Sequence, residues 1–483
     1  MKLTENRLLR QQCYINGQWR DADGGGTFAV TNPATGAELA RVPDMGADET
    51  RRAIEAANAA WPAWRSKTAK QRATILRDWF NLIMAHQEDL AVLMTAEQGK
   101  PLAEAKGEVA YGASFIEWFA EEGKRIYGDV IPSHGPDKRI VVIKQPIGVV
   151  AAITPWNFPN AMITRKCAPA LAAGCPVVIK PAALTPLSAL ALAELAEQAG
   201  MPPGVLNILT TKRSSAVGAE MTSNPLVRKL SFTGSTEIGR MLYRRSAETV
   251  KRLVLELGGH APFLLFADAD LDRAVDEAIK AKFATTGQDC LGANRFLVER
   301  PVYDAFCTAF AERTRALTMG PGAEDRDLGP LMNAAAVAKQ QAHVADALER
   351  GARLLTGGEV SDLGPNFFEP TVLADVPADA LIFREETFGP VAAIAPFDDE
   401  AEAVARANAT EYGLVAYLHT MDPRRIHRLA RAFDFGMVAV NRTKVTGAPI
   451  PFGGMKQSGL GREGARHGLE AFTEIKYVCR DWA

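Results

Sequence analysis

The central part of the chain alternates between short apolar runs and longer stretches with one apolar and one polar face. The apolar runs have the length of β-strands, and apolar residues recur at helical spacing between them. Apolar strands that alternate with helices are typical of a parallel sheet covered on both faces. We expect strands at 147–153, 176–180, 204–209, 229–233 and 253–257, and helices at 163–174, 186–200 and 235–247.

A second alternation of the same kind begins near residue 262. Apolar runs at 262–266 and 294–299 are each followed by a helical pattern, at 270–287 and 302–317. We therefore expect a second α/β domain. The length of 483 residues agrees with this, because a single hydrophobic core stops growing at about 250–300 residues.

Three segments outside these alternations also carry a pattern. Residues 48–98 repeat apolar positions every three or four residues, which predicts helices. Residues 126–146 predict a β-hairpin with a charged Gly-Pro tip, and residues 474–479 predict a strand without an obvious neighbour. Such leftover strands pair either with each other or with a second subunit.

The composition is that of an ordinary globular protein, and it narrows the function classes. Hydrophobic residues make up 47% and charged residues 23%, and a net charge of −2 without a basic cluster argues against nucleic-acid or membrane partners. The sequence shows no apolar run of membrane-spanning length and no signal-peptide pattern at its start. Six cysteines without a CxxC pair predict reduced thiols, a cytoplasmic location and no metal site.

The stretch FTGSTEIG (232–239) follows a predicted strand and opens a predicted helix. Gly234 allows a ligand to approach the backbone closely, and a helix N-terminus favours a phosphate. The stretch lacks the GxGxxG pattern of an ordinary dinucleotide fold. Taken alone, it is equally compatible with a tight strand-to-helix turn.

Three further residues have side chains suited to catalysis. Asn157 stands in the rigid loop ITPWNFPN, where a fixed amide can form half of an oxyanion hole. Glu256 ends the apolar strand of LVLELGGH, where burial raises the pKa of a carboxyl toward that of a general base. Cys290, in TTGQDCLGANR, is either a nucleophile or an inert buried thiol. Each of the three, taken singly, is also compatible with a structural role.

These motifs occur in one chain together with EETFGPV (385–391) and PFGGMKQSGLGREG (451–464). The set resembles the NAD(P)-dependent aldehyde dehydrogenase superfamily over nearly the whole chain, from YINGQW at 14–19 to EIKYVC at 474–479. The stretch NFPNAMITRKCAPALAAGCPVVIKPA and the C-terminal motifs are most similar to the succinate-semialdehyde dehydrogenase branch.

The resemblance implies a role for each candidate site residue. Cys290 matches the nucleophile, Glu256 the general base, and Asn157 the oxyanion donor that acts with the backbone N–H of Cys290. The matching cofactor-binding residues are Thr154, Trp156, Lys180, Ala183, Gly234, Ser235, Glu386 and Phe388, and the matching substrate-binding residues are Arg165, Phe158, Thr446 and Phe452.

The resemblance also implies the architecture, an α/β fold of two doubly wound parallel-sheet domains with a small β-flap for oligomerisation. It places the dinucleotide-binding domain at 1–125 and 146–255, the catalytic domain at 256–450, and the flap at 126–145 and 465–483. We expect a homodimer or homotetramer that acts on a small-molecule aldehyde.

The sequence departs from the family pattern at the adenosine end of the expected cofactor site. NAD-selective relatives often carry Glu three residues after the lysine that matches Lys180, where this chain has Ala183. No carboxylate then repels a 2′-phosphate, and Lys212 and Arg213 lie in a loop able to approach it. We expect NAD or NADP as cofactor, with NADP tolerated or preferred.

Further departures concern the substrate pocket. Gly292 replaces a second cysteine that the branch often carries two residues after the nucleophile, which excludes a local disulfide. The branch uses two arginines for the substrate carboxylate; Arg165 matches one, and Ala284 stands in place of the other. Arg442 and Lys444 are candidates for a replacement charge.

The implied reaction is oxidation of an aldehyde to a carboxylic acid, with succinic semialdehyde or a similar semialdehyde as the expected substrate. A Cys290 thiolate attacks the carbonyl, hydride transfer to NAD(P) leaves a thioester, and Glu256 activates the water that releases the acid. The alternatives are a broad aliphatic or aromatic aldehyde dehydrogenase, a cofactor-independent thioester hydrolase that uses Cys290 and Glu256, and a binding protein built on the same fold.

Overall fold

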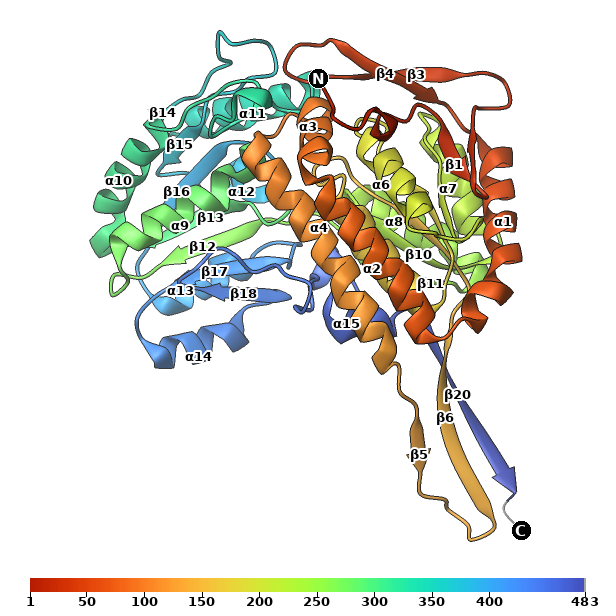
Figure 1. The fold of residues 1–483 in the computed structure, drawn as a ribbon. Helices are drawn as coiled ribbons and strands as arrows, with labels where there is room; N and C mark the ends of the chain where they lie inside the picture. Colours follow the sequence, from red (N-terminus) through yellow and green to blue (C-terminus); the bar gives the residue numbers. More distant parts are fainter. Residues whose placement is uncertain (482–483) are drawn as a thin grey trace.

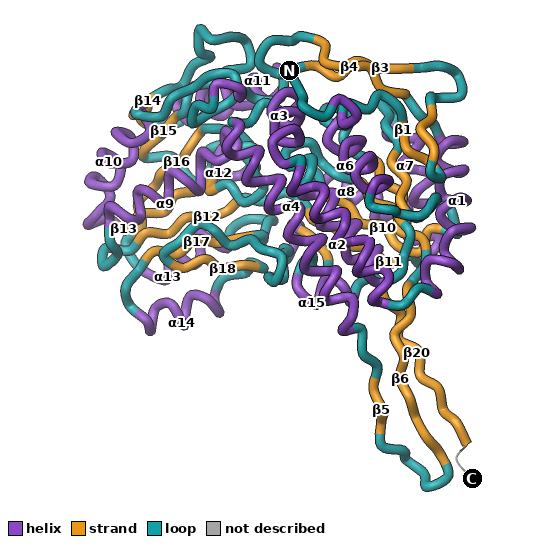
Figure 2. Tube along the Cα trace, in the orientation of Figure 1, coloured by secondary structure: helices purple, strands orange, loops and turns teal. Residues whose placement is uncertain are grey.

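The structure, a computed structural model, describes residues 1–481. It contains two α/β bodies side by side and a narrow three-stranded sheet that projects away from them (Figure 1). In each body, helices enclose the central strands (Figure 2). The expected pair of parallel sheets is therefore present.

The first sheet has the strand order β19-β11-β10-β7-β8-β9-β1-β2. Its five central strands are parallel, and the chain first moves from β7 toward β9 and then returns to β10 and β11 on the other side of β7. The carboxyl ends of β7 and β10 thus flank a topological switch point, where α/β sheets bind ligands. The strands are β1 Cys13–Ile15, β2 Gln18–Arg20, β7 Val149–Ile153, β8 Val177–Lys180, β9 Leu206–Ile208, β10 Val227–Thr233, β11 Arg252–Glu256 and β19 Gly459–Leu460.

Helices from three parts of the chain cover this sheet. Their apolar sides form the first hydrophobic core, in which Trp64, Trp79 and Phe119 are fully buried. The helices are α1 Ala47–Ser66, α2 Ala69–Ala85, α3 Gln87–Gln98, α4 Leu102–Glu122, α5 Ala161–Ala173, α6 Leu187–Gln198, α7 Ser214–Ser223, α8 Thr236–Ser246 and α15 Ala465–Glu470; a separate ribbon consists of β3 Thr27–Thr31 and β4 Glu38–Pro43.

The second sheet has the order β14-β15-β16-β13-β12-β17-β18 and is parallel except for β14. Its cores are separate from those of the first sheet. The strands are β12 Ala261–Leu265, β13 Ala293–Glu299, β14 Arg353–Thr356, β15 Thr371–Ala374, β16 Val391–Phe397, β17 Val415–His419 and β18 Met437–Val440, and the helices are α9 Leu271–Phe283, α10 Tyr303–Arg315, α11 Ala334–Glu349, α12 Leu381–Arg384, α13 Glu400–Asn408 and α14 Pro423–Ala432.

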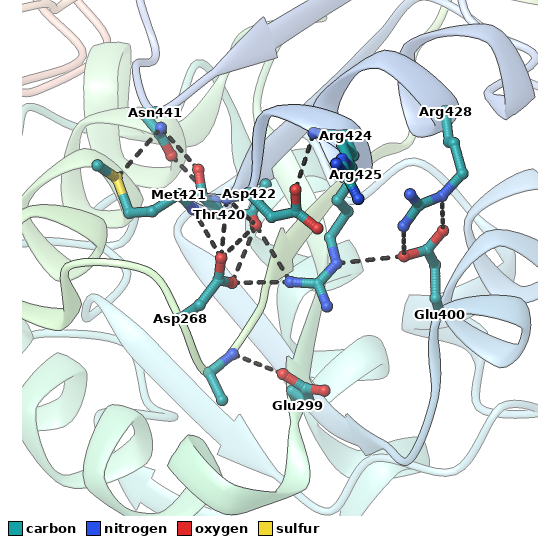
Figure 3. Close-up of polar contacts among 11 residues, drawn as sticks. Asp268, Glu299, Glu400, Thr420, Met421, Asp422, Arg424, Arg425, Arg428 and Asn441 are labelled. Atoms are coloured by element: carbon teal, nitrogen blue, oxygen red, sulfur yellow. Dashed lines mark hydrogen bonds and ion pairs between the residues drawn. The ribbon is translucent and has the colours of Figure 1, made fainter.

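A polar network lies at the carboxyl ends of β12 and β17 (Figure 3). The Asp268 carboxylate accepts hydrogen bonds from the Thr420 hydroxyl and from the N–H groups of Met421 and Asp422, and it pairs with Arg425 at 2.8 Å. Arg425 also reaches Glu400 at the start of α13. Asp268 is thus saturated with donors, and it ties this end of the second sheet to α14.

The projecting sheet consists of β5 Asp129–Ile131, β6 Lys138–Pro146 and β20 Thr473–Asp481. The predicted hairpin at 126–146 is present as β5 and β6, and the C-terminal strand pairs with β6 of the same chain. The helix α15 packs on α5 and α4 of the first body. We therefore propose that the flap starts at Thr473 and not at 465; the other domain boundaries stay predictions.

Candidate active site

The two sheets face each other across one large cavity of about 800 Å³. The first sheet contributes the loops after β7 and β10, the two strands that flank its switch point. The second sheet contributes the segments that precede β12, β13 and β16. The cavity therefore joins the ligand-binding edge of one body to the amino-terminal edge of the other.

Most of the predicted site residues line this cavity. Four lie elsewhere, namely Thr154, Lys180, Ala183 and Glu256. Those on the cavity wall are Cys290, Asn157, Trp156, Gly234, Ser235, Glu386, Phe388, Arg165, Phe158, Thr446 and Phe452. Residues spread over about 300 positions of sequence thus meet in one place, and their roles stay proposals.

The loop that carries Cys290 has an unusual backbone. Thr285 and Thr286 have φ values of 51° and 57°, and Gly287 follows with φ 72°. Non-glycine residues rarely adopt this left-handed conformation. A Cβ atom on Gly259 would lie 2.1 Å from the carbonyl oxygen of Cys290. Only a glycine at position 259, the second glycine of LELGGH, therefore allows this loop to approach so closely. The LELGGH segment and the Cys290 loop therefore pack directly against each other.

The Cys290 thiol is half-buried on the cavity wall. Burial raises its pKa well above the usual value, the neighbouring Asp289 carboxyl raises it further, and Arg165 lowers it. The resting residue is accordingly a thiol. Attack on a carbonyl requires that a base or the bound ligands help to remove its proton.

Asn157 is held so that its amide faces the nucleophile loop. Its Nδ2 donates to the carbonyl oxygen of Gln288 at 3.0 Å, two residues before Cys290. Within residues 1–481, the backbone N–H of Cys290 donates to no protein acceptor. The amide and this N–H are the pair of donors that an oxyanion hole requires.

Glu256 lies at the end of β11 and is 2% exposed. Neither of its carboxylate oxygens has a hydrogen-bond partner among the described residues. Burial raises its pKa well above the usual value, and the nearby Glu463 carboxylate raises it further. A buried carboxyl with a raised pKa is suited to accept a proton near neutral pH, although here it lies against Gly453 and outside the cavity lining.

The cofactor side of the cavity combines a helix N-terminus with a carboxylate. Ser235 caps α8, accepting from the N–H of Ile238 at 3.4 Å, and lines the cavity beside Gly234. Glu386 accepts a hydrogen bond from Gly259 at 2.9 Å through Oε1, and burial raises its pKa to about 7. A helix N-terminus suits a pyrophosphate, and a carboxylate suits ribose hydroxyls.

The same cavity is also lined by an aromatic pair. Trp156 and Phe388 pack edge to face with ring centroids 5.6 Å apart, and both line the cavity. Flat apolar walls of this kind suit a planar ring system. The residues present therefore fit a dinucleotide that extends from α8 toward Glu386.

The residues expected at the adenosine end lie outside the lining of the cavity. Lys180 is the last residue of β8, and its Nζ donates to the carbonyl of Pro181 at 3.2 Å. Arg213 forms an ion pair with Asp44 at 3.6 Å, and the Lys212 ammonium lies 5.6 Å from the Phe28 ring. The approach of Lys212 and Arg213 to a 2′-phosphate stays a prediction, and in this structure the Arg213 guanidinium is paired with Asp44.

The expected substrate wall is centred on Arg165, which is 2% exposed. Its Nε donates to Glu463 at 2.6 Å, and its guanidinium lies 4.1 Å from the Phe452 ring. Of the two candidate replacement cations, Lys444 lines the cavity and Arg442 does not. The cavity lining therefore includes two cationic side chains of this set, Arg165 and Lys444.

Several residues at the site were not predicted from the sequence. Tyr111 lies beside Arg165 and Thr446, and Glu463 binds both Arg165 and Lys166, at 2.6 and 2.5 Å. Burial alone would raise the pKa of Glu463, but these two cations lower it to about 2. The only sequence signal was that Glu463 belongs to the glycine-rich C-terminal motif.

The described residues contain neither a metal-binding cluster nor a membrane-spanning helix. Within residues 1–481, no group of three His, Cys, Asp or Glu side chains could hold a metal ion. In the same range, no helix is long and apolar enough to cross a membrane.

Comparison with known proteins places this site in a family. The model of the aldehyde dehydrogenase family matches residues 19–478. The chain is 59% identical to succinate-semialdehyde dehydrogenase [NADP(+)] GabD of Escherichia coli and 58% identical to glutarate-semialdehyde dehydrogenase of Pseudomonas putida, over 99% of each chain. The crystal structure of an E. coli NADP-dependent enzyme superposes with a TM-score of 0.99 at 59% identity, covering 100% of both chains. The chain therefore belongs to the aldehyde dehydrogenase family, which confirms the family, the fold class and the enzyme class predicted from its motifs.

Proposed function

We propose that the protein oxidises succinic semialdehyde, or a semialdehyde of similar length that carries a carboxylate, to the dicarboxylic acid with NADP or NAD. The observation that carries the proposal is the meeting of Cys290, Asn157 and Arg165 in one cavity. The similar proteins include an NADP-dependent succinate-semialdehyde dehydrogenase and a glutarate-semialdehyde dehydrogenase, which supports the same substrate class.

The covalent steps use the geometry of the nucleophile loop. The thiolate of Cys290 attacks the aldehyde carbon, and the negative charge on oxygen is held by the Asn157 amide and the Cys290 N–H. One such donor is worth about 3 kcal/mol in other enzymes. Trp156 and Phe388 would help to hold a nicotinamide, which would supply the hydride acceptor; loss of hydride from the adduct leaves a thioester on Cys290.

Release of the acid requires a general base. Glu256 is the candidate, since burial already raises its pKa. Because it lies outside the cavity lining, its side chain has to rotate toward Cys290 before it can take a proton from water there. Attack of that water on the thioester gives the acid and returns the thiol.

Substrate choice is tested by replacing Arg165 with methionine. We expect kcat/KM for succinic semialdehyde relative to hexanal to fall about tenfold to a hundredfold, because one charge-assisted hydrogen bond to the carboxylate is lost. The ratio cancels any loss of folded enzyme caused by unpairing Glu463. Arg442→Met, at an exposed cation outside the cavity, serves as the control and should leave the ratio unchanged. Equal losses on both aldehydes, or faster wild-type turnover of hexanal, would favour a general aliphatic aldehyde dehydrogenase.

Cofactor choice is tested by Ala183→Glu. A carboxylate at this half-buried position should bond ribose hydroxyls and repel a 2′-phosphate, which carries a charge of roughly −1.5 to −2. We expect the ratio of kcat/KM for NAD over NADP to rise at least about tenfold. Ala182→Glu, which places the same charge one residue earlier, should change the ratio less. If Ala183→Glu leaves the ratio unchanged, the adenosine end is recognised elsewhere.

The flap supports assembly into a homodimer or homotetramer. Val130, Ile475 and Tyr477 on its strands are each at least 70% exposed, and β20 is an edge strand. Exposed apolar edge strands promote aggregation unless another chain covers them. We place this assembly in the cytoplasm. A cofactor-independent thioester hydrolase is the competing function, and it predicts no reduction of nicotinamide with any aldehyde.

A further inference from the structure

The start of α4 contacts both catalytic loops. Lys100, just before the helix, and Glu104 and Glu108 in its first two turns all line the cavity. Lys100 is 2% exposed and Glu108 is 4% exposed. Charged groups are rarely buried to this extent unless they are paired, so their partners indicate their role.

Lys100 is attached to the residue that carries the oxyanion donor. Its ammonium donates to the backbone carbonyl of Asn157 at 2.8 Å and to Glu108 at 2.5 Å, and it lies 4.2 Å from the ring of Phe158. A fixed carbonyl fixes the Cα atom of Asn157. The point from which the Asn157 amide extends is therefore set by Lys100.

Glu108 holds the other end of the same loop. Its second oxygen accepts hydrogen bonds from the N–H groups of Asn160 at 2.9 Å and Ala161 at 3.1 Å, at the start of α5. A carboxylate at this helix N-terminus stabilises it and at the same time neutralises Lys100. The loop from Asn157 to Ala161 is thus held at both ends by one buried ion pair.

Glu104 makes the matching contact on the opposite wall. Both of its oxygens lie within hydrogen-bond distance of the N–H of Thr285, at 3.0 and 3.1 Å. Thr285 is the first of the left-handed residues that lead to Cys290. One short segment of helix therefore contacts the loop of the nucleophile and the loop of the oxyanion donor.

We propose that Lys100 and Glu108, together with Glu104, are positioning residues that fix the Asn157 amide relative to Cys290. The inference rests on the role proposed above for Asn157. Donors in an oxyanion hole act only if they are already in place, and a displacement of about 1 Å can lower a rate by about a hundredfold. A residue that acts only through Asn157 loses its effect once that amide is removed.

The decisive experiment is a double-mutant cycle on the pre-steady-state burst of reduced nicotinamide with succinic semialdehyde. Lys100→Met should lower the burst rate about 30- to 100-fold in the wild-type background. In an Asn157→Ala background, the same change should alter the rate by less than about threefold. Lys106→Met, at a surface residue of α4 paired with Glu88 at 2.7 Å, is the matched control and should not change the burst.

Three further variants and an alkylation rate separate positioning from loss of structure. Lys100→Met leaves the Glu108 charge buried without its partner, so the paired variant K100M/E108Q should be measured if the single variant does not fold; the same result is expected. Glu104→Ala should slow the burst, and Glu104→Gln, whose amide oxygen still accepts from Thr285, should restore most of the rate. Alkylation of Cys290 by iodoacetamide forms no oxyanion, so its rate in Lys100→Met should match that of the wild type.

The outcomes are distinguishable. An equal loss from Lys100→Met in both backgrounds would overturn this inference and leave Lys100 with a structural role. An unchanged burst rate in Asn157→Ala alone would instead count against the proposed oxyanion donor, and with it the proposed function.

Discussion

Replacing Cys290 with alanine is expected to reduce aldehyde-dependent reduction of NADP to below about one per cent of the wild-type rate. The covalent step needs a thiolate at this position, and no other thiol lines the cavity within the described chain. Binding of NADP should persist, because Trp156, Ser235 and Glu386 are unchanged; titration of the intrinsic tryptophan fluorescence measures it.

A second cysteine provides the matched control. Cys307, which lies in the core of the second body, should tolerate alanine without loss of turnover. Residual turnover well above one per cent in Cys290→Ala would mean that another group attacks the aldehyde. Loss of NADP binding along with turnover would mean that the substitution disturbs the fold of the loop.

Glu256→Gln is expected to lower steady-state turnover about a hundredfold or more while a rapid burst of reduced nicotinamide remains. Glutamine keeps the shape of the side chain but cannot take a proton from water, so the thioester should accumulate. Rapid mixing with succinic semialdehyde separates the burst from the later rate. Equal losses in both phases would assign Glu256 a structural role or a role in activating Cys290.

The same carboxyl should control the pH dependence of acid release. Burial raises the pKa of Glu256, so the group is protonated below that raised pKa and acts as a base only above it. Wild-type turnover limited by this step should therefore rise with pH through the raised pKa. In Glu256→Gln this rise should be absent. A rise that persists unchanged in the variant would point to a different base.

The sequence predicted the five central parallel strands of the first sheet, but only β12 and β13 of the second. Parallel strands buried on both faces are apolar throughout, so a run such as 147–153 stands out, and the structure has β7 there at Val149–Ile153. The short strands β3 and β4 were missed because each buries only some of its residues and carries a weak pattern. Helix α4 also went unnamed, although it provides contacts to both catalytic loops.

The site was predictable only where local motifs carry the chemistry. Cys290, Asn157 and Glu386 stand in stretches whose glycines and prolines mark them. The pairing of Arg165 with Glu463 joins residues 298 positions apart, and neither neighbourhood signals the other. The orientation of the Lys212 and Arg213 side chains could not be predicted either, because a position in a loop does not determine the direction of a long side chain.

The central claim is that aldehyde oxidation proceeds through a thioester on Cys290. Mass spectrometry of the Glu256→Gln variant, quenched after mixing with succinic semialdehyde and NADP, tests it most directly. We predict a succinyl adduct on the peptide that contains Cys290, formed only when NADP is present. Absence of the adduct while NADP is reduced, attachment to another residue, or formation without cofactor would contradict the account.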